Sequence, residues 1–201
     1  EELKVLRDLT DLLRPAQPLL KDLHAMCVAV DDLAARAKYA AQVDGYAPEV
    51  APAPAGLVVN NGRHPLLIGG TVPVVPFDLT LEAGERTVLL SGPNTGGKSV
   101  LLKAVGLHIA MAQSGIIPPV GPESRLPIVE RIFADIGDRQ SIAASLSTFS
   151  AHLALLRVIL DEADARSLVL LDEIGSGTDP AEGSALAGAA LLALTRRQVL
   201  T

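Results

Sequence analysis

The stretch SGPNTGGKSV, residues 91–100, places three glycines just before a lysine and a serine. Its central part follows the spacing G-x-x-x-x-G-K-[ST] of a phosphate-binding loop. Glycines let the backbone wrap an anion with its N–H groups pointing inward, and the helix that follows directs its positive end at the same anion. An ordinary glycine-rich turn is the alternative, which the apolar strand before the loop and the helix after it disfavour. The residues predicted to contact a nucleotide are Gly92, Pro93, Asn94, Thr95, Gly96, Gly97, Lys98 and Ser99.

Charged and hydroxyl side chains complete this chemistry. Lys98 would supply positive charge for the outer phosphates, and the Ser99 hydroxyl is a suitable ligand for Mg²⁺. Downstream, the apolar run LVLLDE (168–173) ends in two acids. We expect Asp172 to join the Mg²⁺ ligands and Glu173 to polarise a water for attack on the γ-phosphate. Alone, this run would equally fit a buried strand with a solvated acidic end, but beside the loop it favours a nucleotide site.

The adjacent acids also indicate which nucleotide is used. Small GTPases orient the attacking water with a glutamine from another loop. An acid directly after the Mg²⁺-binding aspartate is typical of ATP hydrolases of the ABC type. The sequence therefore predicts ATP and Mg²⁺ as ligands, with ADP as product.

The elements that must position these residues follow from hydrophobic periodicity. Residues 1–43 repeat leucines at helical spacing, interrupted by Pro15 and Pro18. Residues 44–56 are rich in Pro, Ala and Gly and are predicted to be a linker. We therefore expect a helical core or lever segment with its linker at 1–56 and an ATPase domain at 57–201.

Beyond the linker, strand and helix patterns alternate, which predicts an α/β fold with a mostly parallel sheet and antiparallel edge strands. The strand before the glycine-rich loop is almost continuously apolar and should be buried on both faces. The expected strands are 57–59, 66–70, 72–81, 85–91, 129–136 and 167–173; the expected helices are 98–115, 147–163 and 182–197, with a loop at 118–127.

Composition narrows the class of protein. The chain is 49% hydrophobic with 2% aromatic residues, so aliphatic side chains must fill its core. A net charge of −6 and the lack of basic clusters interleaved with aromatics argue against a nucleic-acid-binding surface in this segment. Cys27 is the single cysteine, which excludes an internal disulfide, and no run suits a membrane span. We expect a cytoplasmic protein.

Four stretches together resemble the ATPase domain of the MutS proteins. They are GPNTGGKS (92–99), MAQSGIIPP (111–119), SLSTFSAH (145–152) and LLDEIGSGTDPAEGSALA (170–187). Thr95 stands where the mismatch-repair branch usually has Met. Together with TDPAEG (178–183), DIGDRQS (135–141) and NGRHPLL (61–67), it makes the chain look most like the MutS-two branch, the bacterial paralogues with a C-terminal Smr domain. The resemblance covers residues 57–201 and implies a P-loop NTPase fold of the ABC type.

The resemblance implies further site residues. Gln113 matches the Q-loop glutamine, near Mg²⁺ and the attacking water. Ser147 matches the signature serine, which lies at a helix start and faces the nucleotide of the partner subunit. Asn94 would sense the γ-phosphate across the dimer, and residues 175–179 would couple the two sites. Val74 stands near the adenine position, where the mismatch-repair branch often has a stacking aromatic, so base recognition should be weaker or use another platform.

The remaining features of the sequence carry no predicted catalytic role. The four histidines (His24, His64, His108 and His152) are expected to be packed or solvated rather than catalytic. The chain lacks the family's later His-bearing loop, begins without Met and ends at Thr201 soon after an apolar run starts. We therefore expect a piece of a longer protein, with its ATPase domain truncated at the C-terminus.

The implied function is an ATPase that dimerises across nucleotide and drives conformational change in DNA recombination control. Branched DNA would bind outside this segment, and an endonuclease activity would belong to a domain outside it. Three alternatives remain open: a ribosome as the target in translation quality control, another ABC-type DNA-maintenance ATPase, and a nucleotide-gated clamp that does not turn over.

Overall fold

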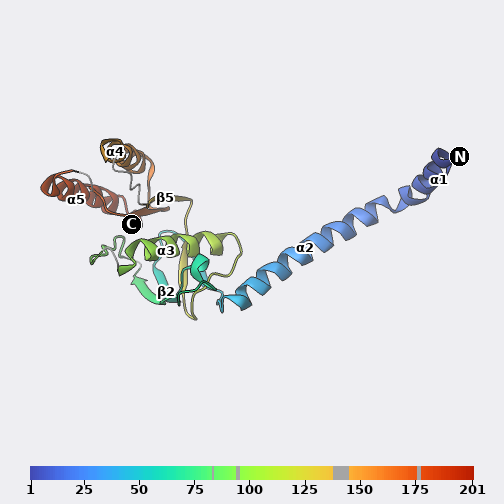
Figure 1. Cartoon of the computed structure of the whole chain (residues 1–201), viewed down its shortest axis with the longest axis horizontal. Helices are drawn as coiled ribbons and strands as arrows, with labels where there is room; N and C mark the ends of the chain where they lie inside the picture. The colour runs from blue at the N-terminus through green and yellow to red at the C-terminus, as the bar shows by residue number, and fades with distance from the viewer. Residues whose placement is uncertain (83, 94–95, 138–144, 176–177) are drawn as a thin grey trace.

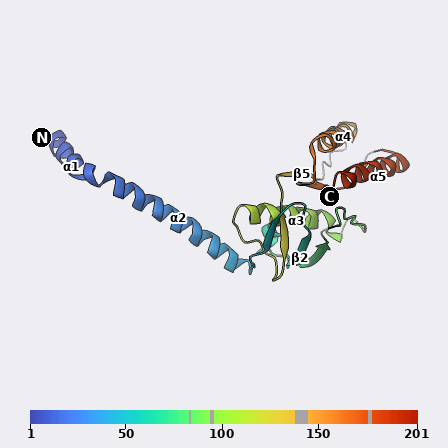
Figure 2. The same ribbon diagram turned by 180° about the vertical axis from the view of Figure 1, so that it is seen from behind.

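The computed structural model describes residues 1–82, 84–93, 96–137, 145–175 and 178–201. The chain forms a mixed α/β body from which a long helical arm projects, with the N-terminus at the far end of the arm (Figures 1 and 2). In the described part of the chain, no helix is long and apolar enough to cross a membrane.

The arm consists of α1 (Glu2–Leu13), the 3₁₀ helix η1 (Arg14–Ala16) and α2 (Gln17–Gln42). The two prolines bend the helical path without ending it, because Pro15 lies in η1 and Pro18 lies in the first turn of α2. A helix tolerates proline in its first turn, where the missing N–H would have had no partner anyway. No residue of α1 is buried, and Ala40 alone is buried in α2.

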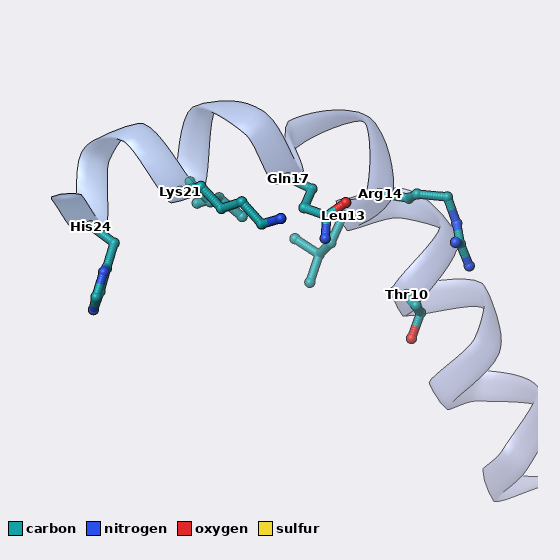
Figure 3. A pocket seen from close by; sticks show the side chains of 7 residues that line it. Thr10, Leu13, Arg14, Gln17, Lys21 and His24 are labelled. Carbon is teal, nitrogen blue, oxygen red and sulfur yellow. The ribbon is translucent and has the colours of Figure 1, made fainter.

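At the bend, side chains from both helices line one open cavity of about 420 Å³ (Figure 3). The lining residues are Thr10, Leu13, Arg14, Gln17, Leu20, Lys21 and His24. The leucines of the arm remain largely exposed, for example Leu13 at 59% and Leu20 at 49%. Their helical spacing thus presents an apolar stripe to solvent.

A four-stranded sheet forms the base of the body, in the order β1 (Glu49–Pro52), β4 (Arg125–Ile128), β2 (Leu57–Gly62) and β3 (Phe77–Leu81). Only β1 and β4 pair in parallel; β2 pairs antiparallel with both neighbours. The mostly parallel pairing expected is therefore not seen among these four strands, where β2 runs antiparallel to β3 and β4, although antiparallel edge strands were also predicted.

Strand β1 lies within the predicted linker at 44–56, so part of that segment is built into the sheet. Likewise, β4 begins inside the predicted loop at 118–127. The prolines of both segments led to these errors: Pro52 ends β1, and Pro127 lies in β4. The division into two domains at residue 56 stays a prediction.

The second sheet pairs β5 (Arg131–Asp135) with β6 (Ser167–Leu171) in parallel. Leu200 bridges to Leu168 on the other side of β6. Next to it, Thr201 donates its backbone N–H to the Arg86 carbonyl (2.7 Å) and accepts one from Val88 (2.8 Å). Residues 85–91, predicted as a strand buried on both faces, form no regular strand, and Leu89 is 76% exposed. The backbone at 86–88 reaches β6 through the segment at 199–201.

Helices cover both faces of this second sheet, with α3 (Lys98–Gln113) on one face and α4 (Ser145–Glu162) and α5 (Pro180–Arg196) on the other (Figure 1). Side chains of β6 alternate between the two cores. Leu168 and Leu170 pack in the cluster that includes α3, and Val169 packs with Ile159 and Leu194 of the other two helices. All of these side chains are at most 5% exposed. A continuous apolar run is therefore required in β6.

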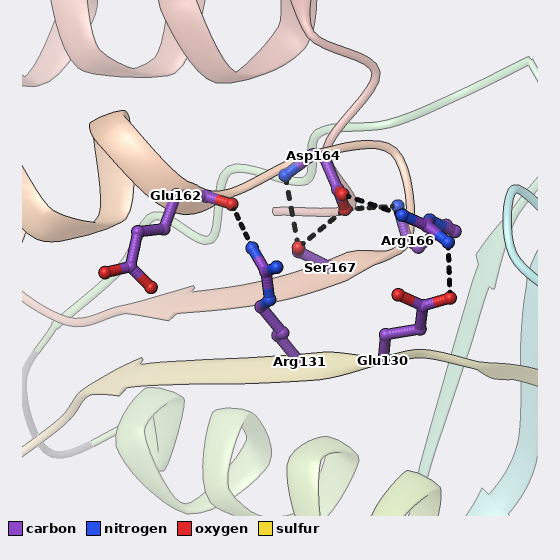
Figure 4. Close-up of polar contacts among 6 residues, drawn as sticks. All are labelled: Glu130, Arg131, Glu162, Asp164, Arg166 and Ser167. Atoms are coloured by element: carbon purple, nitrogen blue, oxygen red, sulfur yellow. Dashed lines mark hydrogen bonds and ion pairs between the residues drawn. The ribbon is translucent and has the colours of Figure 1, made fainter.

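Polar contacts close the turn between α4 and β6, at the edge where β5 and β6 begin (Figure 4). The Asp164 carboxylate accepts from the Arg166 backbone N–H (2.9 Å) and from the Ser167 hydroxyl (3.0 Å), and these bonds lower the pKa of Asp164. The Arg166 guanidinium also pairs with Glu130 (2.5 Å), and Arg131 donates to the carbonyl that ends α4 (2.6 Å). The turn geometry of this edge is fixed by its own side chains.

His108 is a fully buried histidine on α3. Its ring stacks on Phe77 at 6.0 Å between centroids, and Nε2 donates to the Arg63 carbonyl (2.9 Å). Nδ1 is buried and has no hydrogen-bond partner in the described part of the chain. Burial lowers the pKa of His108, because protonation would leave a buried N–H and a buried charge. The folded state therefore holds this imidazole neutral.

This histidine should make stability depend on pH. A histidine in the unfolded chain takes up a proton near pH 6.5, whereas folded His108 stays neutral at that pH. The free energy of unfolding therefore falls as the pH drops below that value. For one group, the fall is at most about 1.4 kcal/mol per pH unit. We expect the melting temperature to be lower at pH 5.5 than at pH 7.5, and His108→Gln to reduce that difference. His24→Gln, on the exposed face of α2, should keep the wild-type difference; equal behaviour of the two variants would contradict this account.

Two glycines pin the loop that follows β6 to the first turn of α5. A Cβ at Gly183 would lie 2.5 Å from the Gly175 carbonyl oxygen, and one at Gly175 would lie 2.6 Å from Gly183 Cα. Gly175 also has a φ of 81°, which disfavours other residues. Asp179 caps the helix, its side chain accepting from the Ala181 N–H at 2.9 Å. The backbone contact thus fixes where the loop runs.

Gly183→Ala should therefore destabilise the protein, because backbone must move to admit the methyl group. Overpacking of this kind costs about 1–3 kcal/mol. Gly188 is the matched control: it lies on the same helix, and a Cβ there meets nothing within 4 Å. Gly188→Ala should raise stability by up to about 1 kcal/mol through helix propensity. Thermal unfolding of both variants checks this, and equal melting temperatures would refute the proposed contact.

Candidate nucleotide-binding site

The glycine-rich loop leads directly into α3. Lys98 is the first residue of the helix, and Gly97 before it has a φ of 77°, in the left-handed region that glycine tolerates best. Within the loop, the Gly96 N–H donates to the Pro93 carbonyl (3.0 Å). Asn94 and Thr95 lie outside the described residues. The N–H groups of the first turn of α3 thus directly follow the loop, as an anion site requires.

The Lys98 side chain folds back over the start of the loop. Its ammonium donates to the carbonyls of Gly92 (2.6 Å) and Pro93 (2.9 Å). These bonds hold the positive charge against the carbonyls at the start of the loop. A phosphate group bound in the loop would therefore lie close to the Lys98 ammonium.

The Ser99 hydroxyl and the Asp172 carboxylate meet across two elements. Ser99 Oγ, on the first turn of α3, donates a hydrogen bond to Asp172 Oδ2, directly after β6. The Asp172 N–H donates to the Asp135 carbonyl (2.9 Å), which sets the position of the residue beyond the strand. One hydroxyl and one carboxylate are hard oxygen donors of the kind Mg²⁺ selects. The residues present therefore fit this metal.

A pure protein site for a metal is not found in the described ranges, which hold no group of three or more His, Cys, Asp and Glu that could bind one. Mg²⁺ commonly takes only one or two protein oxygens and completes its shell with water and phosphate. The Ser99–Asp172 pair is thus suited to a metal that arrives with a nucleotide.

Glu173 follows at the end of the same strand, in a left-handed conformation with a φ of 50°. A residue other than glycine pays for this conformation, on the order of 1 kcal/mol. Its exposed side chain lines a cavity of about 240 Å³ together with Lys98 and Asp172. The strained backbone thus places an exposed carboxylate beside the predicted phosphate and metal residues.

Gln113 is not brought to this site. It ends α3, whose 16 residues separate it from Lys98 by about 22 Å along the axis. Its amide forms two bonds with one residue at the opposite edge of the sheet, donating to the Val129 carbonyl (3.0 Å) and accepting from the Val129 N–H (2.9 Å). Here Gln113 connects α3 to the chain leading into β5, remote from Lys98 and Asp172.

For Ser147 and Val74, the two remaining predicted residues, the structure gives the element or segment but no contact at the site. Ser147 lies in the first turn of α4, as the resemblance implies, and its side chain is outside the described part. Val74 is half-buried in the segment before β3. For both residues, a role at the nucleotide stays a prediction.

Sequence reasoning missed the pair of His152 and Asp135. His152 Nδ1 lies 2.7 Å from Asp135 Oδ2, and both side chains are mostly buried, at 27% and 19% exposed. Asp135 ends β5 opposite Leu171 of β6, so it lies at the same sheet edge as Asp172. The predicted strands at 129–136 and 167–173 each carry an acid at or next to their C-terminal end, and this was the signal that could have revealed the edge.

Comparison with known proteins identifies the family of this chain. Residues 88–200 match the family model described as MutS domain V. Proteins named Endonuclease MutS2 are similar over most of the chain. One from Gemmatimonas aurantiaca is 55% identical over 98% of the chain and 24% of its own length, and one from Carboxydothermus hydrogenoformans is 42% identical over 98% of the chain and 25% of its own length.

A third relative, Endonuclease MutS2 of Pelotomaculum thermopropionicum, is 52% identical over 79% of the chain and 20% of its own length. The chain spans about a quarter of the length of these curated relatives. The matched region contains the glycine-rich loop, both residues of the Ser99–Asp172 contact, and α4. The chain belongs to the MutS family, and its relatives place it in the MutS2 branch.

Proposed function

We propose that this chain is the ATP-hydrolysing part of a MutS2-like protein, with a P-loop fold of the ABC type. The observation that carries the proposal is the meeting of Ser99 and Asp172 beside Lys98, at the loop that opens α3. The family match over residues 88–200 supports it, because that region contains all of these residues.

In the proposed reaction, the loop amides and Lys98 bind the phosphates of ATP and neutralise charge on the γ-phosphate. Ser99 and Asp172 would hold Mg²⁺, which when bound offsets charge on the β- and γ-phosphates. Glu173 accepts a proton from the attacking water, a role supported by its place in the lining of the cavity that Lys98 and Asp172 also line. ADP and phosphate leave as products.

ATP binding is proposed to close two copies of the chain head to tail. The start of α4, which carries Ser147, then faces the nucleotide of the partner copy. Its helix N-terminus suits an anion, so a γ-phosphate favours the closed pair and hydrolysis releases it. This step rests on the family resemblance and on the position of Ser147 in the first turn.

The arm is proposed to carry the change outward. Its base is tied to the body by Arg36, which donates to the Ser114 carbonyl at the end of α3. Arg63 donates to the carbonyls of Val43 and Asp44 just after α2, both at 2.8 Å. Since α3 starts at the nucleotide loop and ends at this joint, a shift of α3 would move the arm.

The proposed target of the whole protein is branched DNA. The relatives are named endonucleases, a name for enzymes that cleave nucleic acids internally. The net charge of −6 on this chain assigns that contact to other parts of the protein. The ribosome alternative gains no support from these names. Capture of partners from cells by the full-length protein with Glu173→Gln distinguishes the two, since recovered ribosomes would replace DNA as the target.

Glu173→Gln should abolish turnover and keep ATP binding, because the amide retains the shape of the side chain and cannot accept the proton. We expect the hydrolysis rate to fall about 100-fold or more. Lys98→Ala should instead weaken nucleotide binding by about 10- to 100-fold, through loss of charge-assisted contacts. Steady-state ATPase assays and isothermal titration with ATP separate the two effects.

Glu162→Gln provides the control, since it removes an equal charge from the exposed far end of α4. It should behave as wild type in both assays. Wild-type turnover in the Glu173 variant would show that another group is the base. Tight ATP binding with no turnover in the wild-type full-length protein would favour the nucleotide-gated clamp instead.

A further inference from the structure

His152 joins α4 to the sheet edge that carries the metal-binding residues. It lies in the second turn of α4, five residues beyond Ser147, or about 7.5 Å along the helix. Its Nδ1 lies 2.7 Å from Asp135 Oδ2. A carboxylate oxygen accepts, so Nδ1 carries the proton and donates it.

The bond belongs to a continuous chain of contacts. The carbonyl of the same Asp135 accepts the N–H of Asp172 (2.9 Å), and the Asp172 carboxylate accepts the hydroxyl of Ser99. Asp135 thus binds α4 through its side chain and binds Asp172 through its backbone carbonyl. A shift of His152 would therefore reach the metal-binding residues through one residue, Asp135.

Burial makes this contact specific. The two side chains are 27% and 19% exposed, so solvent competes weakly for their polar atoms. On the same helix, the ion pair of Arg157 with Asp161 is long at 3.8 Å and highly exposed at both ends. Packing of α4 through Ile159 and Leu155 holds its second half against β6 and α5. In the first half of the helix, His152 supplies a polar attachment to this edge.

We propose that His152 is a positioning residue for ATP hydrolysis. Its bond to Asp135 sets the start of α4 relative to Asp172, and so aligns Ser147 of one copy for the nucleotide of the other. The inference rests on the proposed function. Nucleotide binding within one copy depends on the loop and Lys98, so loss of the bond should act on turnover rather than on affinity.

Two substitutions of similar polarity separate the bond from simple packing. Asn places its amide nitrogen where His places Nδ1, whereas Gln places its amide nitrogen nearer the position of Nε2. His152→Asn should therefore keep the bond to Asp135, and His152→Gln should lose it. In the full chain, we expect His152→Gln to lower kcat by about 10- to 100-fold with little change in the affinity for ADP. His152→Asn should restore most of the wild-type kcat.

A second measurement does not depend on catalysis. Hydrogen exchange, followed by mass spectrometry without nucleotide, should be faster in the first turns of α4 for His152→Gln than for wild type or His152→Asn. Equal kcat values, or equal exchange in the Asn and Gln variants, would overturn the positioning role. Absence of turnover in wild type would count against the proposed function alone, because the exchange comparison would still decide whether His152 positions α4.

Discussion

The hydrogen bond between Ser99 and Asp172 is the contact on which the nucleotide site depends, because it joins the first turn of α3 to the end of β6. Ser99 belongs to the helix, whereas Asp172 follows the strand, so the two residues are far apart in the sequence. Their meeting requires α3 to lie against β6 in one register, and the close packing of Gly106 beneath Leu170 fixes that register. Small changes in helix–sheet packing would therefore separate the two oxygen donors.

Strand β6 is the element that makes this register possible. Its two faces are buried in different cores, one shared with α3 and the other with α4 and α5. Movement of the strand would disturb both cores at once. Beyond the end of β6, Glu173 and Gly175 both have left-handed backbone conformations. The backbone of Gly175 also lies in close contact with that of Gly183. A rigid strand thus delivers its acids to a loop that is held by backbone contact.

The sequence predicted the parts of the site whose function depends on local spacing. The loop around Lys98, the helix after it and the apolar strand before Asp172 were all found, because each pattern is contained in a few consecutive residues. The four-stranded sheet was predicted poorly, since β1 pairs with β4 some 76 positions away (Glu49 with Arg125) and its proline-rich sequence resembles a linker. Gln113 and His152 show the same limit: their partners, Val129 and Asp135, follow from tertiary packing.

The most direct test is a crystal structure of the protein with Mg²⁺ and a non-hydrolysable ATP analogue. The account predicts that the Lys98 ammonium leaves the carbonyls of Gly92 and Pro93 for the phosphates. It also predicts a metal ion between Ser99 Oγ and the Asp172 carboxylate. A nucleotide bound elsewhere, with the Lys98 and Ser99 contacts unchanged, would contradict it.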